Sequence, residues 1–202
     1  MAISRAISFV LFLWVAFLLN SVSPLDFRTF GLVPRDPWGL PGIILMPFLH
    51  GSMSHLFYNS ISLLAMLSIL YGCISSPDRV SVACLRIILI SGVLLWLLGR
   101  ATNQDGLKMV HIGASGLAYG LVTFSFCCSI WTKNIWLFFA STFVLAYTGL
   151  SLFGGLLPND SLISWDGHLA GAVAGVIAAS IDHKDLTCSK PSGSFSDSLS
   201  DQ

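Results

Sequence analysis

Residues 111–130 read HIGASGLAYGLVTFSFCCSI. The stretch opens with a histidine, glycines and a serine, and it continues as a predominantly apolar run. A transmembrane α-helix needs about 20 mostly apolar residues to cross the hydrocarbon core of a bilayer. The length and composition of this stretch therefore predict a transmembrane helix over about 113–130, with polar side chains where the helix begins.

Comparable apolar runs occur along most of the chain. They lie at about 6–22, 55–74, 80–98, 135–153 and 165–181. The runs are solidly hydrophobic rather than alternating, and backbone groups in hydrocarbon must be satisfied within their own segment, so we expect helices rather than strands. The sequence thus predicts an all-α, polytopic membrane helix bundle with six transmembrane helices.

The segments outside these runs complete the predicted organisation. Residues 23–54 carry five prolines among aromatic and polar residues, which argues against a continuous helix there. The six spans define one membrane domain over 1–182. Residues 183–202 are polar and rich in serine, and they predict a disordered tail.

Composition excludes several classes of protein. Hydrophobic residues make up 54% of the chain and charged residues only 10%, whereas a soluble domain carries about 25% charged residues. The net charge is zero and no basic patch is visible, so we expect a lipid bilayer as the surroundings and no nucleic acid as a partner. The five cysteines include no CxxC pair, so neither a disulfide framework nor a metal site is predicted, and no cofactor is expected.

Two features of the topology stay open at this point. The first apolar run follows Arg5 and resembles a signal peptide, but it is long for one and no small-x-small cleavage site follows, which favours a retained helix. An even number of spans places both termini on one side. Counting lysines and arginines in the loops weakly favours cytoplasmic termini, and Arg86, inside the third run, is expected to extend its guanidinium to the nearer interface.

Polar residues inside the predicted spans carry the functional information, because each is costly in hydrocarbon unless it is satisfied. The second run opens with HGSMSHLFYN at residues 50–59. His55 and Asn59 are four residues apart and project from one helical face, and both side chains can donate hydrogen bonds toward one point. His50 precedes the helix, so periodicity does not place it.

Ser115 and Tyr119 share one face of the helix expected over 113–130. Ser115 falls in the first turn, where backbone N–H groups have no partner within the helix and the helix dipole is positive. Such a position suits the stabilisation of a developing oxyanion.

The sixth run contains DGHLAGAVAG at residues 166–175. His168 heads a track of small residues at Gly171 and Gly175, and the fourth run offers a matching track at Gly116 and Gly120. Small residues at this spacing let helix backbones approach closely. If the two tracks meet, His168 lies beside Ser115.

Each of these features has a simpler explanation when taken alone. A serine in a membrane helix commonly bonds to its own backbone, an intramembrane histidine commonly joins two helices, and glycine tracks commonly serve packing. Their combination is much more specific. In the order of its motifs and in the helices that carry them, the sequence resembles the rhomboid family of intramembrane serine proteases. The residues that carry the resemblance are His50, His55 and Asn59, then Gly113, Ser115 and Gly116, then His168 with Gly171 and Gly175.

The resemblance covers about residues 5–182 and implies a role for each position. Ser115 would be the nucleophile, and His168 would act as general base and then as general acid. The backbone N–H of Ser115, with His55 and Asn59, would hold the oxyanion in a pocket shaped around Gly113. His50 would support this arrangement and Tyr119 would pack on His168, while Asp166 is not expected to be a third catalytic residue.

The family also implies substrates that are membrane proteins with a single span, cut within or near that span. Many members carry a Trp-Arg pair in the first loop, whereas here Arg35 and Trp38 are separated, which puts the detailed structure of that loop in doubt. Two other functions remain as alternatives: a catalytically inactive binding or quality-control protein of the same fold, and a small transporter or channel. A zinc protease is not supported because no HExxH motif occurs.

Overall fold

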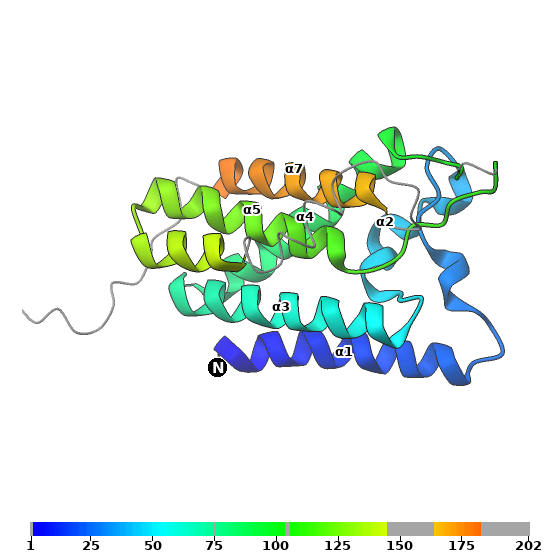
Figure 1. Cartoon of the computed structure of the whole chain (residues 1–202), viewed down its shortest axis with the longest axis horizontal. Helices are drawn as coiled ribbons and strands as arrows, with labels where there is room; N and C mark the ends of the chain where they lie inside the picture. Colours follow the sequence, from blue (N-terminus) through cyan, green and yellow to red (C-terminus); the bar gives the residue numbers. More distant parts are fainter. Residues whose placement is uncertain (1, 75, 104–105, 145–163, 183–202) are drawn as a thin grey trace, which may run out of the picture.

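A computed structural model gives the fold and describes residues 2–74, 76–103, 106–144 and 164–182. The long helices are α1 (Ala2–Val22), α3 (Met53–Cys73), α4 (Pro77–Leu98), α5 (Ser115–Thr132) and α7 (Trp165–Asp182). Within the described ranges the regular elements are all helical. The long helices pack in one bundle, and the short elements that connect α1 with α3 lie at one end of it (Figure 1).

Four of these helices, α1, α3, α4 and α5, are long and apolar enough to cross a membrane. Helix α7 has 18 residues, but two aspartates and a histidine lower its mean hydropathy. A shorter apolar helix covers Ile135–Val144. The prediction of an all-helical membrane bundle is confirmed, and its count of six spans is approximate, since residues 145–153 of the expected fifth span and the expected tail at 183–202 lie outside the described residues.

The proline-rich connection between α1 and α3 folds into short helical pieces, as its composition indicated. These are η1 (Phe27–Phe30), η2 (Pro37–Gly39), α2 (Gly42–Leu45) and η3 (Met46–Phe48). Of these, α2 packs closely against α4: a methyl group at Gly92 would lie 2.7 Å from the carbonyl oxygen of Ile43. Arg35 donates from Nη1 to the carbonyl oxygens of Leu97 and Gly99, at 3.1 and 2.8 Å, and so caps the end of α4. Trp38, by contrast, is 89% exposed.

Helices α5 and α7 run parallel and touch through glycine along their length. A methyl group at Gly171 would lie 2.0 Å from the carbonyl oxygen of Gly116, and one at Gly175 would lie 2.0 Å from that of Gly120. Helix α7 therefore has no room for a side chain at these two positions. The two predicted tracks meet in register, and both helices begin at the same end of the bundle (Figure 1).

At the opposite end of the bundle, ion pairs join the helices. Arg86 of α4 forms an ion pair with Asp182, the last residue of α7. Arg5 of α1 pairs with Asp78 of α4 at 2.7 Å. In these ion pairs each charge near a helix end is balanced by an opposite charge. For Arg86, which the sequence placed only at the nearer interface, the structure gives Asp182 as the partner.

Candidate active site

Ser115 and His168 form the centre of the site. Ser115 is the first residue of α5 and His168 lies in the first turn of α7. The Ser115 hydroxyl oxygen lies 2.8 Å from His168 Nε2, within hydrogen-bond distance. The contact expected from the glycine tracks is thus present, because parallel packing of α5 on α7 brings the two helix starts together.

Tyr119 lies one turn below Ser115 and stacks on the imidazole of His168. The ring centroids are 4.4 Å apart and the planes are inclined by 14°. Tyr119 is only 6% exposed, so its ring has little freedom to turn away. In this stacked orientation, Nε2 is the ring nitrogen of His168 that points toward the hydroxyl of Ser115.

Gly113 marks where His55 and Asn59 approach the turn before Ser115. Its φ of +111° belongs to the region that favours glycine. A methyl group there would lie 2.5 Å from the His55 ring and 3.6 Å from Asn59 Nδ2. The backbone N–H of Gly113 is bonded to the carbonyl oxygen of Met46 at 2.8 Å, which holds the turn in place. Two side chains of α3 therefore face the start of α5, where α5 also presents unpaired backbone N–H groups.

His50 contacts the second of these side chains. Asn59 Nδ2 donates to His50 Nε2 at 3.1 Å, and the His50 and His55 rings meet edge to face with centroids 5.2 Å apart. Burial, helped by the neighbouring charge of His55, lowers the pKa of His50 to about 4. At neutral pH the imidazole is therefore neutral and can accept the hydrogen bond that orients Asn59.

A second polar cluster beside the site was not predicted. His111, Ser164 and Asp166 surround the backbone of Arg100, which follows α4. His111 and Asp166 belong to the motifs quoted above, which predict no structural role for them, and Ser164 lies outside those motifs. The signal in the sequence is three polar residues at or just before the starts of the two helices that carry Ser115 and His168.

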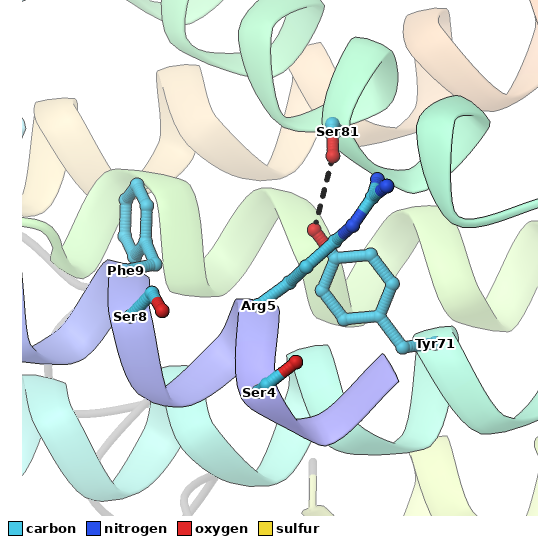
Figure 2. A pocket seen from close by; sticks show the side chains of 6 residues that line it. All are labelled: Ser4, Arg5, Ser8, Phe9, Tyr71 and Ser81. Atoms are coloured by element: carbon cyan, nitrogen blue, oxygen red, sulfur yellow. Dashed lines mark hydrogen bonds between the residues drawn. The ribbon is translucent and has the colours of Figure 1, made fainter. Parts of the chain in front are cut away.

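A cavity of about 500 Å³ lies away from this site, where α1 and α4 begin and α3 ends. Figure 2 shows its lining, in which Arg5 extends past Tyr71 among serine hydroxyls, with Tyr71 bonded to Ser81. Its lining residues are Ser4, Arg5, Ser8, Phe9, Tyr71 and Ser81. None of the predicted site residues contributes to it.

The chain is similar to a known protein family and to several known proteins. Residues 37–185 match the family profile of the Rhomboid domain. A protein of Mycobacterium tuberculosis is 33% identical over 175 residues, which cover 86% of this chain and 72% of the relative; a protein of Mycobacterium bovis matches to the same extent. A protein of Mycobacterium leprae is 30% identical over 141 residues, covering 68% and 54% of the two chains. All three relatives carry the name "uncharacterized protein". Together with the four apolar helices, the match identifies an integral membrane protein.

Proposed function

Because this chain belongs to the rhomboid family, we propose that it is an intramembrane serine endopeptidase with Ser115 as nucleophile and His168 as general base. The observation that carries the proposal is the 2.8 Å contact between Ser115 Oγ and His168 Nε2. A serine is a weak nucleophile unless an adjacent base takes its proton, and this distance is the one that proton transfer requires.

The chemistry follows from these positions. As Ser115 Oγ attacks the carbonyl carbon of the scissile peptide, His168 Nε2 takes the hydroxyl proton. The tetrahedral intermediate collapses when the C–N bond breaks and His168 returns the proton to the leaving amine. Water then attacks the acyl-enzyme, again with His168 as base, and releases the carboxylate product and free Ser115.

The developing oxyanion has donors on two sides. The start of α5 supplies backbone N–H groups and the positive end of a helix dipole. Asn59 and His55 face the same turn, across Gly113. Donors fixed in advance of the reaction stabilise the transition state more than mobile ones do, and the hydrogen bond from Asn59 to His50 supports such fixation.

Tyr119 takes the place of the carboxylate that orients histidine in soluble serine proteases. The carboxylate of Asp166 is engaged instead by the backbone N–H of Arg100 at 2.7 Å. The proposed machinery is therefore a dyad held by an aromatic stack.

The proposed substrates are membrane proteins with a single span, presented to a site at one end of a multi-pass bundle. We place the termini in the cytoplasm and the dyad toward the opposite face. The bias of charge behind this orientation is small: Arg5, Arg79, Lys133, Lys184 and Lys190 count for the cytoplasmic side, against Arg28, Arg35, Arg100 and Lys108 for the other. Assignment of the whole of 1–182 to the membrane domain remains a prediction.

A fluorophosphonate probe tests the proposal, because it reacts covalently with activated serines. Detergent-solubilised protein should be labelled and should cleave a test substrate with one span. Both activities should vanish in Ser115→Ala and in His168→Ala. Ser62→Ala is the matched control, since Ser62 is a half-buried serine on α3 that donates to the carbonyl oxygen of Tyr58, and it should react as wild type.

Two results would overturn the proposal. An inactive binding protein or a transporter would leave the wild type unlabelled and the substrate intact. Labelling that persists in Ser115→Ala would place the reactive serine elsewhere.

A further inference from the structure

The cluster around Arg100 is a closed ring of contacts within hydrogen-bond distance. The backbone N–H of Arg100 donates to Asp166 Oδ2 at 2.7 Å. The other carboxylate oxygen accepts from Ser164 Oγ at 3.1 Å, and the same hydroxyl lies 2.7 Å from His111 Nδ1. His111 Nε2 completes the ring at 3.0 Å from the carbonyl oxygen of Arg100.

Chemistry determines the hydrogen on His111 Nε2 and limits where the Ser164 hydroxyl can donate. A carbonyl oxygen only accepts, so His111 Nε2 carries a hydrogen and donates it to Arg100. Ser164 has one hydroxyl hydrogen, so beside a neutral imidazole it donates either to Asp166 Oδ1 or to His111 Nδ1, and both bonds form together only when Nδ1 is protonated and donates to the hydroxyl. The hydroxyl also accepts from the backbone N–H of Gly167 at 3.2 Å, which fixes Ser164 against the first turn of α7.

The ring joins three segments that are far apart in sequence. Arg100 follows the end of α4, His111 lies four residues before Ser115, and Ser164 and Asp166 lie four and two residues before His168. His111 is also paired with Leu32 through both backbone groups, at 3.0 and 2.8 Å. The segments that lead into α5 and α7 are therefore both attached to the end of α4.

Two members of the ring are shielded from solvent, Arg100 and Ser164 are half-buried, and the charge of Asp166 is balanced. His111 is 3% exposed and Asp166 is 9% exposed. The Arg100 guanidinium lies 3.5 Å from Asp166 and 5.2 Å from the centre of the Trp165 ring. Hydrogen bonds in such surroundings are strong, and removal of one partner leaves a buried polar group unsatisfied.

The dyad needs a device of this kind because both of its members sit at helix starts. Terminal turns lack the full set of helical hydrogen bonds and fray. The glycine tracks bring α5 and α7 into contact, and Thr123 Oγ1 donates to the carbonyl oxygen of Ala172 at 2.8 Å further along the two helices. The first turns, which carry Ser115 and His168, need directional hydrogen bonds of their own.

We propose that the ring formed by Arg100, His111, Ser164 and Asp166 positions the dyad, by fixing the starts of α5 and α7 relative to the end of α4. The inference rests on the proposed function and adds positioning residues to it. The ring makes no contact with the reacting atoms and acts through Ser115 and His168. A displacement of about 1 Å at a reacting group lowers catalysis by roughly 10²-fold.

The test compares Ser164→Ala, which opens the ring, with Ser164→Thr, which keeps the hydroxyl. The rate constant of fluorophosphonate labelling and kcat for substrate cleavage should fall by about tenfold to 10²-fold in Ser164→Ala, with KM unchanged. Ser164→Thr should restore both to within about twofold of the wild type. Asp166→Asn, which removes the charge and one acceptor oxygen, should behave as Ser164→Ala does.

Thermal unfolding of each variant separates positioning from global stability. A kcat loss in Ser164→Ala with an unchanged unfolding temperature, rescued by threonine, supports the inference. If Ser164→Ala fails to fold, Asp166→Asn and His111→Gln carry the comparison. Wild-type labelling rates in folded ring variants would overturn the inference and leave the proposed function intact, whereas an unlabelled wild type overturns both.

Discussion

Tyr119 stacks on His168 with 4.4 Å between ring centroids and 14° between ring planes. The tyrosine stands on the same helix as Ser115, one turn further on, so α5 supplies both the hydroxyl that bonds to the imidazole and the ring that orients it. A carboxylate partner for His168 inside a bilayer would be costly to bury. An aromatic ring can instead orient the imidazole by the area of their contact, without a charge.

The stack predicts a difference between two substitutions. Tyr119→Phe keeps the ring and should retain most of the cleavage rate. Tyr119→Ala frees the imidazole to rotate and should lower kcat by about 10²-fold, the scale expected for a displaced catalytic group. Steady-state cleavage of a substrate with one span measures both, and equal activity in the two variants would contradict the orienting role.

Asn59 should contribute to the transition state rather than to substrate binding. Asn59→Ala is expected to lower kcat by about 10²–10³ or less, as for loss of one oxyanion donor, with little change in KM. His50→Ala should have a smaller effect in the same direction, because it releases Asn59 without removing it. An increase in KM with unchanged kcat in Asn59→Ala would assign Asn59 to substrate binding instead.

The glycine contact between α5 and α7 predicts a test of packing. Gly171→Ala would place a methyl group 2.0 Å from the carbonyl oxygen of Gly116, so the helices must separate. We expect a loss of about 1–3 kcal/mol in unfolding free energy together with loss of labelling at Ser115.

Gly72→Ala is the control, since nothing lies within 4 Å of that position on α3. Alanine is a better helix former than glycine, so this variant should be at least as stable as the wild type. Thermal unfolding followed by tryptophan fluorescence distinguishes them. Gly171→Ala with wild-type stability would show that the two backbones are not in contact.

The buried His50 predicts a pH dependence of stability. Burial lowers its pKa from 6.5 to about 4, so between these values the unfolded chain binds the proton more readily than the folded one. Stability from this group is complete above pH 6.5, falls as the pH is lowered and levels off below about pH 4. The loss amounts to ~3 kcal/mol.

His50→Gln keeps a hydrogen-bonding side chain but cannot titrate, so it should flatten the dependence of the unfolding temperature on pH in this window. A slope remains because burial also lowers the pKa of His111. An identical slope in His50→Gln and wild type would show that His50 titrates normally.

The sequence by itself determined the class of fold and much of the site. The backbone hydrogen-bonding groups of long apolar runs can be satisfied in a bilayer only if the runs form helices. Helical periodicity alone then places His55 on one face with Asn59, Ser115 with Tyr119, and His168 with Gly171 and Gly175. These are local regularities, which depend on neighbours three or four residues apart. The resemblance to a family then joined the separate motifs.

The tertiary structure decided what lies between elements. Ser115 contacts His168, which lies 53 residues later in the chain. This register depends on how the glycine faces of the two helices pack on each other, and no periodicity within either helix specifies it. The same holds for the use of Arg35 to cap α4, for the pairing of Arg86 with Asp182, and for the ring at Arg100. Hydrogen bonds have short range and strict direction, so their partners are known only once the helices have been placed.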